Sequence, residues 1–375
     1  MNPRFLIAFA LSAAVATLLI KLCFTPVNRA VSNPDPAPAP NVYQDATVLH
    51  VGKSPVGSPA SIPPEARTIQ DWNQLGLKGL LNLEKKDYPS IDRAQLQAYL
   101  LHTNESVDAL LVANALFDTD PSFLGTALER YPRDPRVLFA TALSDQFQDQ
   151  RKTALESLLE HDPENAYALY LASSHSFDQN DYDSAISLLK EGVQKNHLES
   201  YRIHNWQAAQ EFFQHLGFSS DVANGLAAVP VFRAPHPAQL LVPYLKELES
   251  HYDSLIKSDQ TVEALELAAL AIETGNSLSQ GQDEDLQAEY IGLALEASFL
   301  EKLDPNLDYQ YFPDGVPILR SSVQNQEVQL NELLMAMMES VPKATNLQLA
   351  HYLDRVKLFG DRAANQWLVA QIQGP

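Results

Sequence analysis

The sequence has few residues of the kinds on which disulfide scaffolds, metal sites and nucleic-acid binding depend. It contains one cysteine in 375 residues, which excludes an intramolecular disulfide framework and a cysteine-cluster metal site. Lysine and arginine number 26 against 47 acidic residues, so the formal net charge is -21. Phosphate neutralisation and polybasic membrane association both need a basic face. The composition therefore argues against nucleic acid as a partner and against a polybasic membrane-surface module.

Motifs of the common enzyme classes are also missing. The sequence has no G-x-S-x-G elbow, no phosphate-binding P-loop, no G-x-G-x-x-G turn and no H-E-x-x-H pair. His197 and His204 fall seven residues apart on one predicted helix, a separation of about 10 Å that is too long for one metal ion. Cys23 lies in an apolar segment, where it is unavailable as a catalytic thiol. We therefore expect no cofactor, no metal and no enzymatic activity.

The overall composition is that of a folded helical protein. Apolar residues make up 45% of the chain and charged residues 19%, which is enough to build a buried core. At about 100–200 residues per domain, the length predicts two domains or one extended repeat array. No stretch shows sustained strand alternation with hairpin turns, so the predicted fold class is all-α.

The first 24 residues predict a transmembrane anchor or a signal segment. Residues 5–24 are apolar apart from Lys21, and with that side chain snorkelling they make about 30 Å of helix, enough to span a bilayer. A cleaved signal peptide is the alternative, although the nearest cleavage site, residues 28–30, lacks a small residue three positions before the cut. An anchor with so short a leading end places the bulk of the chain on the exported, periplasmic or extracytoplasmic side.

Residues 25–65 predict a Pro/Ala/Ser-rich linker. Proline alternates with other residues over residues 33–40, which excludes a helix or a central strand there. Such a segment favours a semi-rigid polyproline II spacer that holds a domain away from the membrane. A proline-motif ligand for some partner is the alternative.

From residue 66 onward the apolar periodicity is helical, and aspartate–proline pairs mark helix starts. Aspartate caps the free N–H groups of a first turn, and proline at the first helical position costs nothing. The pairs are Asp120-Pro121, Asp134-Pro135 and Asp162-Pro163. Together they predict three helix pairs whose first helices begin 28 or 29 residues apart: 106–117 with 121–131, 135–147 with 151–161, and 163–177 with 182–195.

The third pair, residues 163–196, resembles a tetratricopeptide repeat. Tyr182 and Ala185 match the aromatic-x-x-alanine start of that family's second helix, and Asp162-Pro163 matches its inter-repeat turn. The period is shorter than the family's value of about 34 residues, and Gly192 stands where alanine is usual. The first two units are degenerate. The resemblance implies a solenoid of stacked antiparallel helix pairs with a concave peptide-binding groove; an irregular bundle of capped helices is the alternative.

The repeat array is predicted to occupy residues 66–229, followed by a hinge at 230–243 and an acidic helical domain at 244–375. The hinge holds four prolines that argue against any helix: Pro230, Pro235, Pro237 and Pro243. The other predicted helices cover residues 68–85, 91–101, 198–216, 238–256, 260–273, 284–302, 324–341, 344–358 and 362–372, with a loop over 303–318.

The C-terminal half carries most of the negative charge. Residues 241–340 contain 19 acidic and 4 basic residues, a net charge of -15. This excess predicts either a solvated helical surface or an acidic face that steers a basic protein partner. Asp283, Glu284 and Asp285 precede a predicted helix, where capping explains them better than a calcium site.

The sequence therefore predicts a non-catalytic, membrane-tethered scaffold that binds a protein or peptide partner through a repeat groove, through the acidic face, or through both. An architectural envelope component and a hydrolase-type enzyme with an unrecognised carboxylate site are the alternatives. The polar positions on the first helices of the pairs predict the lining of the groove: Asn114, Ser144, Ser174 and Asp178.

Overall fold

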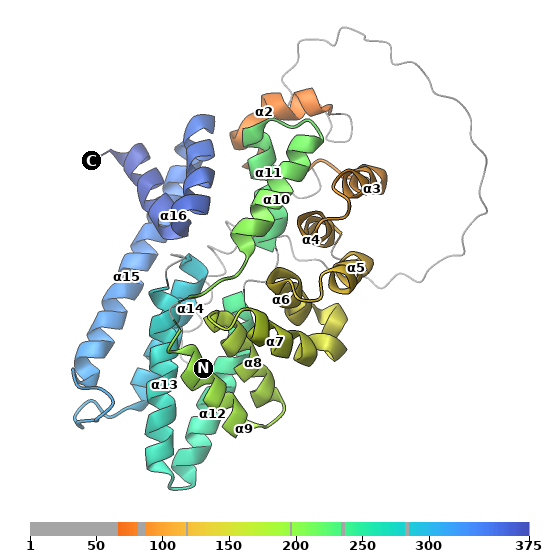
Figure 1. Cartoon of the computed structure of the whole chain (residues 1–375). Coiled ribbons are helices and arrows are strands. Elements are labelled where there is room, and N and C mark those ends of the chain that lie inside the picture. Colours follow the sequence, from red (N-terminus) through yellow and green to blue (C-terminus); the bar gives the residue numbers. More distant parts are fainter. Residues whose placement is uncertain are drawn as a thin grey trace, which may run out of the picture.

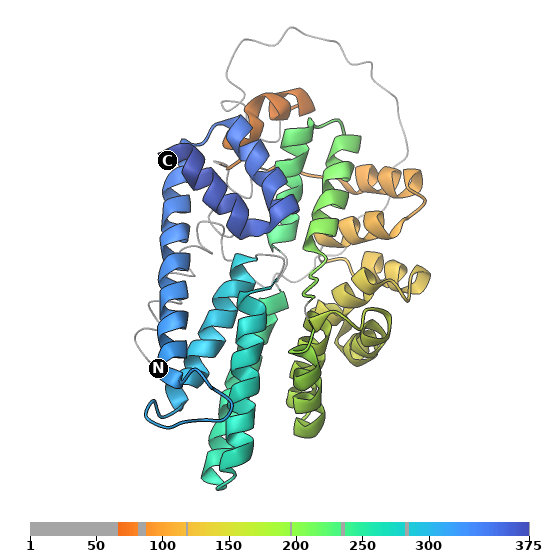
Figure 2. The same ribbon diagram turned by 60° about the vertical axis from the view of Figure 1, so that its left-hand side comes forward.

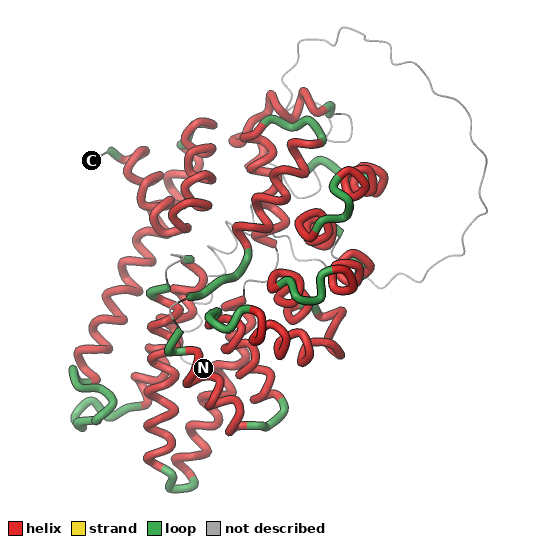
Figure 3. Tube along the Cα trace, viewed as in Figure 1, coloured by secondary structure: helices red, strands yellow, loops and turns green. Residues whose placement is uncertain are grey.

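The computed structural model describes residues 67–81, 88–117, 119–195, 197–233, 237–281 and 285–374. Across these ranges the chain is helical (Figure 3), and its only strand-like pairing is one bridge between Asn165 and His197. The predicted all-α class is confirmed. The predicted anchor (1–24) and linker (25–65) lie outside the described residues. Among the helices that are described, none combines the length and the apolar character needed to cross a membrane.

Helices follow one another along the whole described chain, and they are labelled in Figure 1. The first half contains α2 (Ile69–Leu81), α3 (Arg93–His102), α4 (Val107–Leu116), α5 (Ser122–Arg130), α6 (Pro135–Leu143), α7 (Arg151–His161), α8 (Ala166–Asp178) and α9 (Tyr182–Gly192). The second contains α10 (Arg202–His215), α11 (Ser220–Arg233), α12 (Pro237–Lys257), α13 (Thr261–Ser279), α14 (Leu286–Lys302), α15 (Val316–Ser340) and α16 (Asn346–Gln373). Two 3₁₀ segments, η4 (Asp145–Gln150) and η5 (Val341–Lys343), complete the set.

The aspartate–proline signals mark helix starts with one instructive exception. Asp134 caps α6 as predicted, accepting the N–H of Arg136. At the third pair the helix begins later, at Ala166, and its cap is Asn165. Asp162 is engaged elsewhere, because its carboxylate accepts hydrogen bonds from the Asn165 amide and the Tyr201 hydroxyl. A tertiary contact has therefore moved the start of α8 away from the proline.

The prediction that residues 230–243 exclude a helix was wrong. Helix α11 contains Pro230 and α12 contains Pro243, and only residues 234–236 between them lie outside the described part. Pro237 is the first residue of α12, where its missing N–H costs nothing. Pro230 and Pro243 each remove one helical hydrogen bond, and burial of neighbouring side chains such as Tyr244 outweighs that loss. Helix α11 itself was not predicted.

The boundaries of α6 and α15 also differ from the prediction. Helix α6 ends at Leu143, and the chain continues as the 3₁₀ segment η4, which Ser144 caps. Helix α15 begins at Val316, inside the predicted loop, because Pro317 falls in its first turn, where proline is tolerated.

The predicted helix pairs pack in series: α4 with α5, α6 with α7 and α8 with α9, with α5 on α6 and α7 on α8 (Figure 1). Later parts of the chain then contact each first helix of this array. Helix α10 packs on α4, Tyr201 places its ring against Phe139 of α6, and α12 packs on α8. The first helices of the array are therefore covered in part by the chain's own second half.

The packing closes into a ring. Helices α13 and α14 follow α12, α15 packs on α14, and α16 packs on α15, α11 and α2; Figure 2 shows α16 and α2 at the same end. Gly76 interrupts α2 with a φ of 66°, a conformation that favours glycine. Beyond the interruption, the Lys78 N–H donates to Asn346 Oδ1 at 2.7 Å. The first residue of α16 thus caps the second part of α2.

Buried side chains form two clusters, and each draws on both sides of residues 230–243. One cluster includes Leu138, Leu189, Leu241 and Phe299, and the other includes Leu110, Trp206 and Leu368. Residues that precede the predicted hinge thus share each core with residues that follow it. The two halves of the chain are joined by packing in two places.

Helices α13 and α14 approach each other closely at two glycines. A Cβ on Gly292 would lie 2.3 Å from the carbonyl oxygen of Gly275 and 2.6 Å from the nitrogen of Ser279. No side chain of any other residue type fits in that space. This contact fixes the hairpin that carries Asp285, Glu289 and Glu296.

Candidate functional site

The four predicted partner-binding residues are spread along the array. Asn114 lies on α4 and Ser144 caps η4, where its hydroxyl accepts the N–H of Gln146. Ser174 and Asp178 lie on α8, with Asp178 as its last residue. Ser174 and Asp178 lie one turn apart on α8, while α4, α6 and α8 are joined to one another through α5 and α7.

Of these four residues, Asp178 lies near a carboxylate from another helix, because α12 packs on α8. The buried hydroxyl groups of Tyr244 and Ser173 lie 2.7 Å apart, and Ser173 also donates to the carbonyl of Ala185 at 2.7 Å. This chain of bonds fixes α12 against both helices of the third pair. Glu247, one turn beyond Tyr244, is thereby placed beside Asp178.

Asp178 and Glu247 form a carboxyl pair. Burial raises the pKa of Glu247, and the charge of Asp178 and its side-chain contact with Glu247 raise that pKa further. The Oε2 atom of Glu247 is buried and has no hydrogen-bond partner in the described part of the chain. Two carboxylates that face each other repel one another, so a cation placed between them would be held strongly.

Aromatic rings border this carboxyl pair. His251, one turn beyond Glu247, stacks on Tyr182 with ring centroids 4.4 Å apart and planes 11° apart. Phe177 lies edge-on to Tyr182, with centroids 5.6 Å apart, and burial lowers the pKa of His251. We call these five residues, Phe177, Asp178, Tyr182, Glu247 and His251, the acidic-aromatic site. Carboxylates beside aromatic faces recognise ammonium and guanidinium groups.

A second like-charge pair lies elsewhere in the acidic half. Burial and the nearby charge of Glu301 on α14 raise the pKa of Glu327 on α15. Two of the region's four basic residues are engaged away from this pair: Lys302 pairs with Asp253 at 2.9 Å, and Arg320 donates to the carbonyl oxygens of Leu300 and Leu303. The negative charge around α12–α15 is therefore left to attract an external cation.

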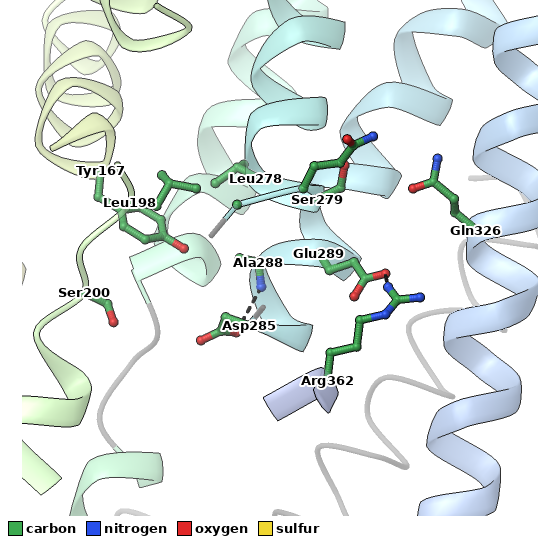
Figure 4. A pocket seen from close by; sticks show the side chains of 12 residues that line it. Tyr167, Leu198, Ser200, Leu278, Ser279, Asp285, Ala288, Glu289, Gln326 and Arg362 are labelled. Atoms are coloured by element: carbon green, nitrogen blue, oxygen red, sulfur yellow. Dashed lines mark hydrogen bonds and ion pairs between the residues drawn. The ribbon is translucent and has the colours of Figure 1, made fainter. Parts of the chain in front are cut away.

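A cavity of about 380 Å³ lies where the array, the α13–α14 hairpin, α15 and α16 meet (Figure 4). Its two carboxylates are already bound. Asp285 accepts from Arg202 at 3.1 Å and caps α14, and Glu289 pairs with Arg362. The residues Asp283 and Glu284 lie outside the described part, so the capping prediction is confirmed for Asp285 alone. These ion pairs join α10, α14 and α16 across the centre of the ring.

Two further carboxyl groups near this centre have shifted pKa values. Burial raises the pKa of Glu296 to about 7, opposed by a hydrogen bond from Ser279, and Glu296 is 7% exposed. Burial and the charge of Asp285 raise the pKa of Asp361 to about 7, opposed by Arg202. Neither Glu296 nor Asp361 lines the cavity. The carboxylates that do line the cavity, Asp285 and Glu289, are paired with arginine, and such ion pairs hold helices together.

Glu296 gives a pH-dependent prediction. The folded protein holds this proton more tightly than the unfolded chain, so stability falls as the pH rises from 4.5 through about 7. We expect Glu296→Gln to stabilise the protein by about 2 kcal/mol near pH 8 and to have little effect near pH 5. Urea unfolding at the two pH values measures this, with the exposed Glu332→Gln as control. Equal effects of Glu296→Gln at both pH values would contradict the assignment.

The prediction that His197 and His204 share one helix was wrong. His197 does not lie on α10 with His204, because the chain is extended there and the Ala166 N–H donates to the carbonyl of His197 at 2.8 Å. Within the part of the chain that the structure describes, no three histidine, cysteine or carboxylate residues are grouped as metal ligands.

Comparisons with family models, with curated proteins and with solved structures each give no match. The tetratricopeptide resemblance stays a prediction from the sequence. Sequence reasoning found Asp178 but missed Glu247 and His251. Their spacing of four residues on one helix was visible, but no sequence signal paired α12 with α8.

Proposed function

We propose that this chain is a non-catalytic binding protein that holds a basic segment of a protein partner at the acidic-aromatic site. The observation that carries the proposal is the carboxyl pair of Asp178 and Glu247, beside the stacked rings of Tyr182 and His251. A lysine or arginine side chain would relieve the repulsion of the pair and contact the aromatic faces.

The surrounding charge supports this assignment. The net charge of -15 over residues 241–340 attracts a basic partner from a distance and speeds its encounter. A groove along the first helices of the array is the less favoured site, since α10 and α12 pack on α4 and α8. Asp178, at the exposed end of α8, is accessible.

The wider proposal is a tetratricopeptide-like solenoid in two helical halves that acts as a scaffold. This proposal includes a membrane tether formed by residues 1–24, with the bulk of the chain on the exported side. An architectural envelope role uses the same fold without a cation site. A hydrolase is less favoured, because Asp285 and Glu289 of the central cavity are both bound to arginine.

The test is the affinity of the full chain, kept in solution with a mild detergent, for an arginine-rich peptide. The measurement is fluorescence anisotropy at low and high salt, with a peptide carrying glutamine for every arginine as the reference. We expect Glu247→Gln to weaken binding about tenfold. Glu263→Gln is the matched control, because it removes the same charge from an exposed position on α13 in the same half.

Three outcomes distinguish the alternatives. Loss of affinity in Glu247→Gln alone supports the site. Equal loss in Glu247→Gln and Glu263→Gln would show that only the general negative field attracts the peptide, which contradicts a specific site. Failure of the unchanged chain to bind the arginine-rich peptide at low salt would contradict the proposed function itself.

A further inference from the structure

The first part of α16 presents a regular stripe of exposed side chains. Leu347, His351, Asp354 and Leu358 follow one another at spacings of four, three and four residues, which places them on one helical face. Leu347 is 65% exposed and Leu358 72% exposed. The opposite face packs into the core through Leu349 and Val356. Leu347 and Leu358 therefore point away from the core, and the His351 ring lies 6.2 Å from the ring of Trp367 in the second part of α16.

The order of residues in this stripe is symmetrical. If two α16 helices lie antiparallel about a twofold axis between positions 352 and 353, Leu347 faces Leu358 of the second copy. In the same register His351 faces Asp354 of the second copy, and both contacts occur twice. Leucine thus meets leucine, and a histidine meets a carboxylate, at every position of the stripe.

We propose that this stripe is a self-association surface that binds a second copy of the chain in antiparallel orientation. The self-complementary pattern favours a second copy, because an unrelated partner needs no symmetry in the stripe. Asp354 is held in place and still accessible: its Oδ1 accepts from the Asn224 amide at 3.0 Å and lies 3.8 Å from Lys357 Nζ, and its side chain is 57% exposed. The proposal is independent of the acidic-aromatic site.

The size of the surface sets the expected strength. The stripe is about 16 Å long at the rise of an α-helix, so it buries less than the roughly 1,600 Å² of a standard protein interface. We therefore expect a weak dimer that dissociates on dilution. Each substitution in the stripe acts twice, because the same residue is contributed by both copies.

The first test is the mass of the full chain in mild detergent, measured by sedimentation over a range of concentrations. We expect the unchanged chain to shift from monomer to dimer, and Leu358→Asp to raise the dissociation constant at least about tenfold. Leu101→Asp is the matched control, since Leu101 on α3 is 79% exposed and lies outside the stripe. A monomer at all concentrations, or equal loss in both variants, would overturn the proposal.

The second test reverses the charges in the stripe. His351→Asp places two carboxylates opposite each other at both contacts, and we expect it to weaken the dimer. Adding Asp354→His restores opposite partners in the antiparallel register, so the double variant should recover association. Thermal unfolding shows whether each variant remains folded. If the double variant is folded but its dimer is as weak as that of His351→Asp, the antiparallel register is overturned.

Discussion

Gly292→Ala is expected to destabilise the protein by about 3 kcal/mol, because overpacking a close helix crossing outweighs the gain in helix propensity. The added methyl group would lie 2.3 Å from the carbonyl oxygen of Gly275 on α13. Backbone atoms cannot rotate away as a flexible side chain can. The helices must therefore separate, and urea unfolding followed by circular dichroism measures the loss.

Gly125→Ala is the matched control for this substitution. Gly125 lies within α5, and the nearest atom to its added Cβ is the Phe147 ring at 3.9 Å, an ordinary contact distance. Alanine there should stabilise the protein by about 0.5–1 kcal/mol through helix propensity alone. A change of stability in the same direction in both variants would contradict a tight glycine contact between α13 and α14.

Asn165→Ala is expected to cost about 3 kcal/mol, since it leaves several buried polar groups without partners. The side chain is fully buried. Its Oδ1 accepts the N–H groups of Tyr167 and Glu199, both at 3.1 Å, and its Nδ2 donates to the carbonyl of Glu199 at 2.9 Å. One side chain therefore caps α8 and holds the extended segment that leads to α10.

Unfolding in urea measures this loss, and Asn325→Ala provides the reference. Asn325 is exposed on α15, so its truncation should change stability by less than about 0.5 kcal/mol. Hydrogen exchange adds a local measure, because loss of the Asn165 contacts should increase exchange around Tyr201 and the start of α10. Unchanged unfolding and unchanged exchange in Asn165→Ala would contradict the role given to this residue.

Local signals in the sequence predicted most of the helices. Asp134-Pro135 marks the start of α6 because the capping hydrogen bond of Asp134 and the fixed φ of Pro135 both act within the first turn of the helix. Asp162-Pro163 failed to mark the start of α8 because Tyr201, distant in sequence, binds the same carboxylate. Sequence patterns predict such boundaries only where no tertiary contact competes for the capping group.

The prolines illustrate the same limit. Pro230 and Pro243 lie inside helices although proline is the strongest local signal against one. Both helices that contain them are packed by other parts of the chain, with α11 on α10 and α12 on α8. Their stability comes from burial, which a propensity argument does not count. The predicted hinge depended on propensity alone.

The candidate site depended on pairing that no local pattern encodes. Asp178 was predicted as a polar residue on a first helix, and the charge excess of residues 241–340 pointed to the other half. The meeting of Asp178 with Glu247 requires α12 to pack on α8 through the Ser173–Tyr244 hydrogen bond. Both ends of that bond are ordinary polar residues in the sequence.

The most direct test of the central claim is the number of protons released when the acidic-aromatic site binds a cation. Burial, together with the neighbouring carboxylate of Asp178, raises the pKa of Glu247 above its ordinary value of 4.5, and a bound arginine lowers it again. Calorimetric titration of the arginine-rich peptide into the full chain, in two buffers of different ionisation heat at each of several mildly acidic pH values, counts these protons. We predict proton release by the unchanged chain and a clearly smaller release by Glu247→Gln. Equal proton release by the two proteins would contradict the claim that a cation binds at this carboxyl pair.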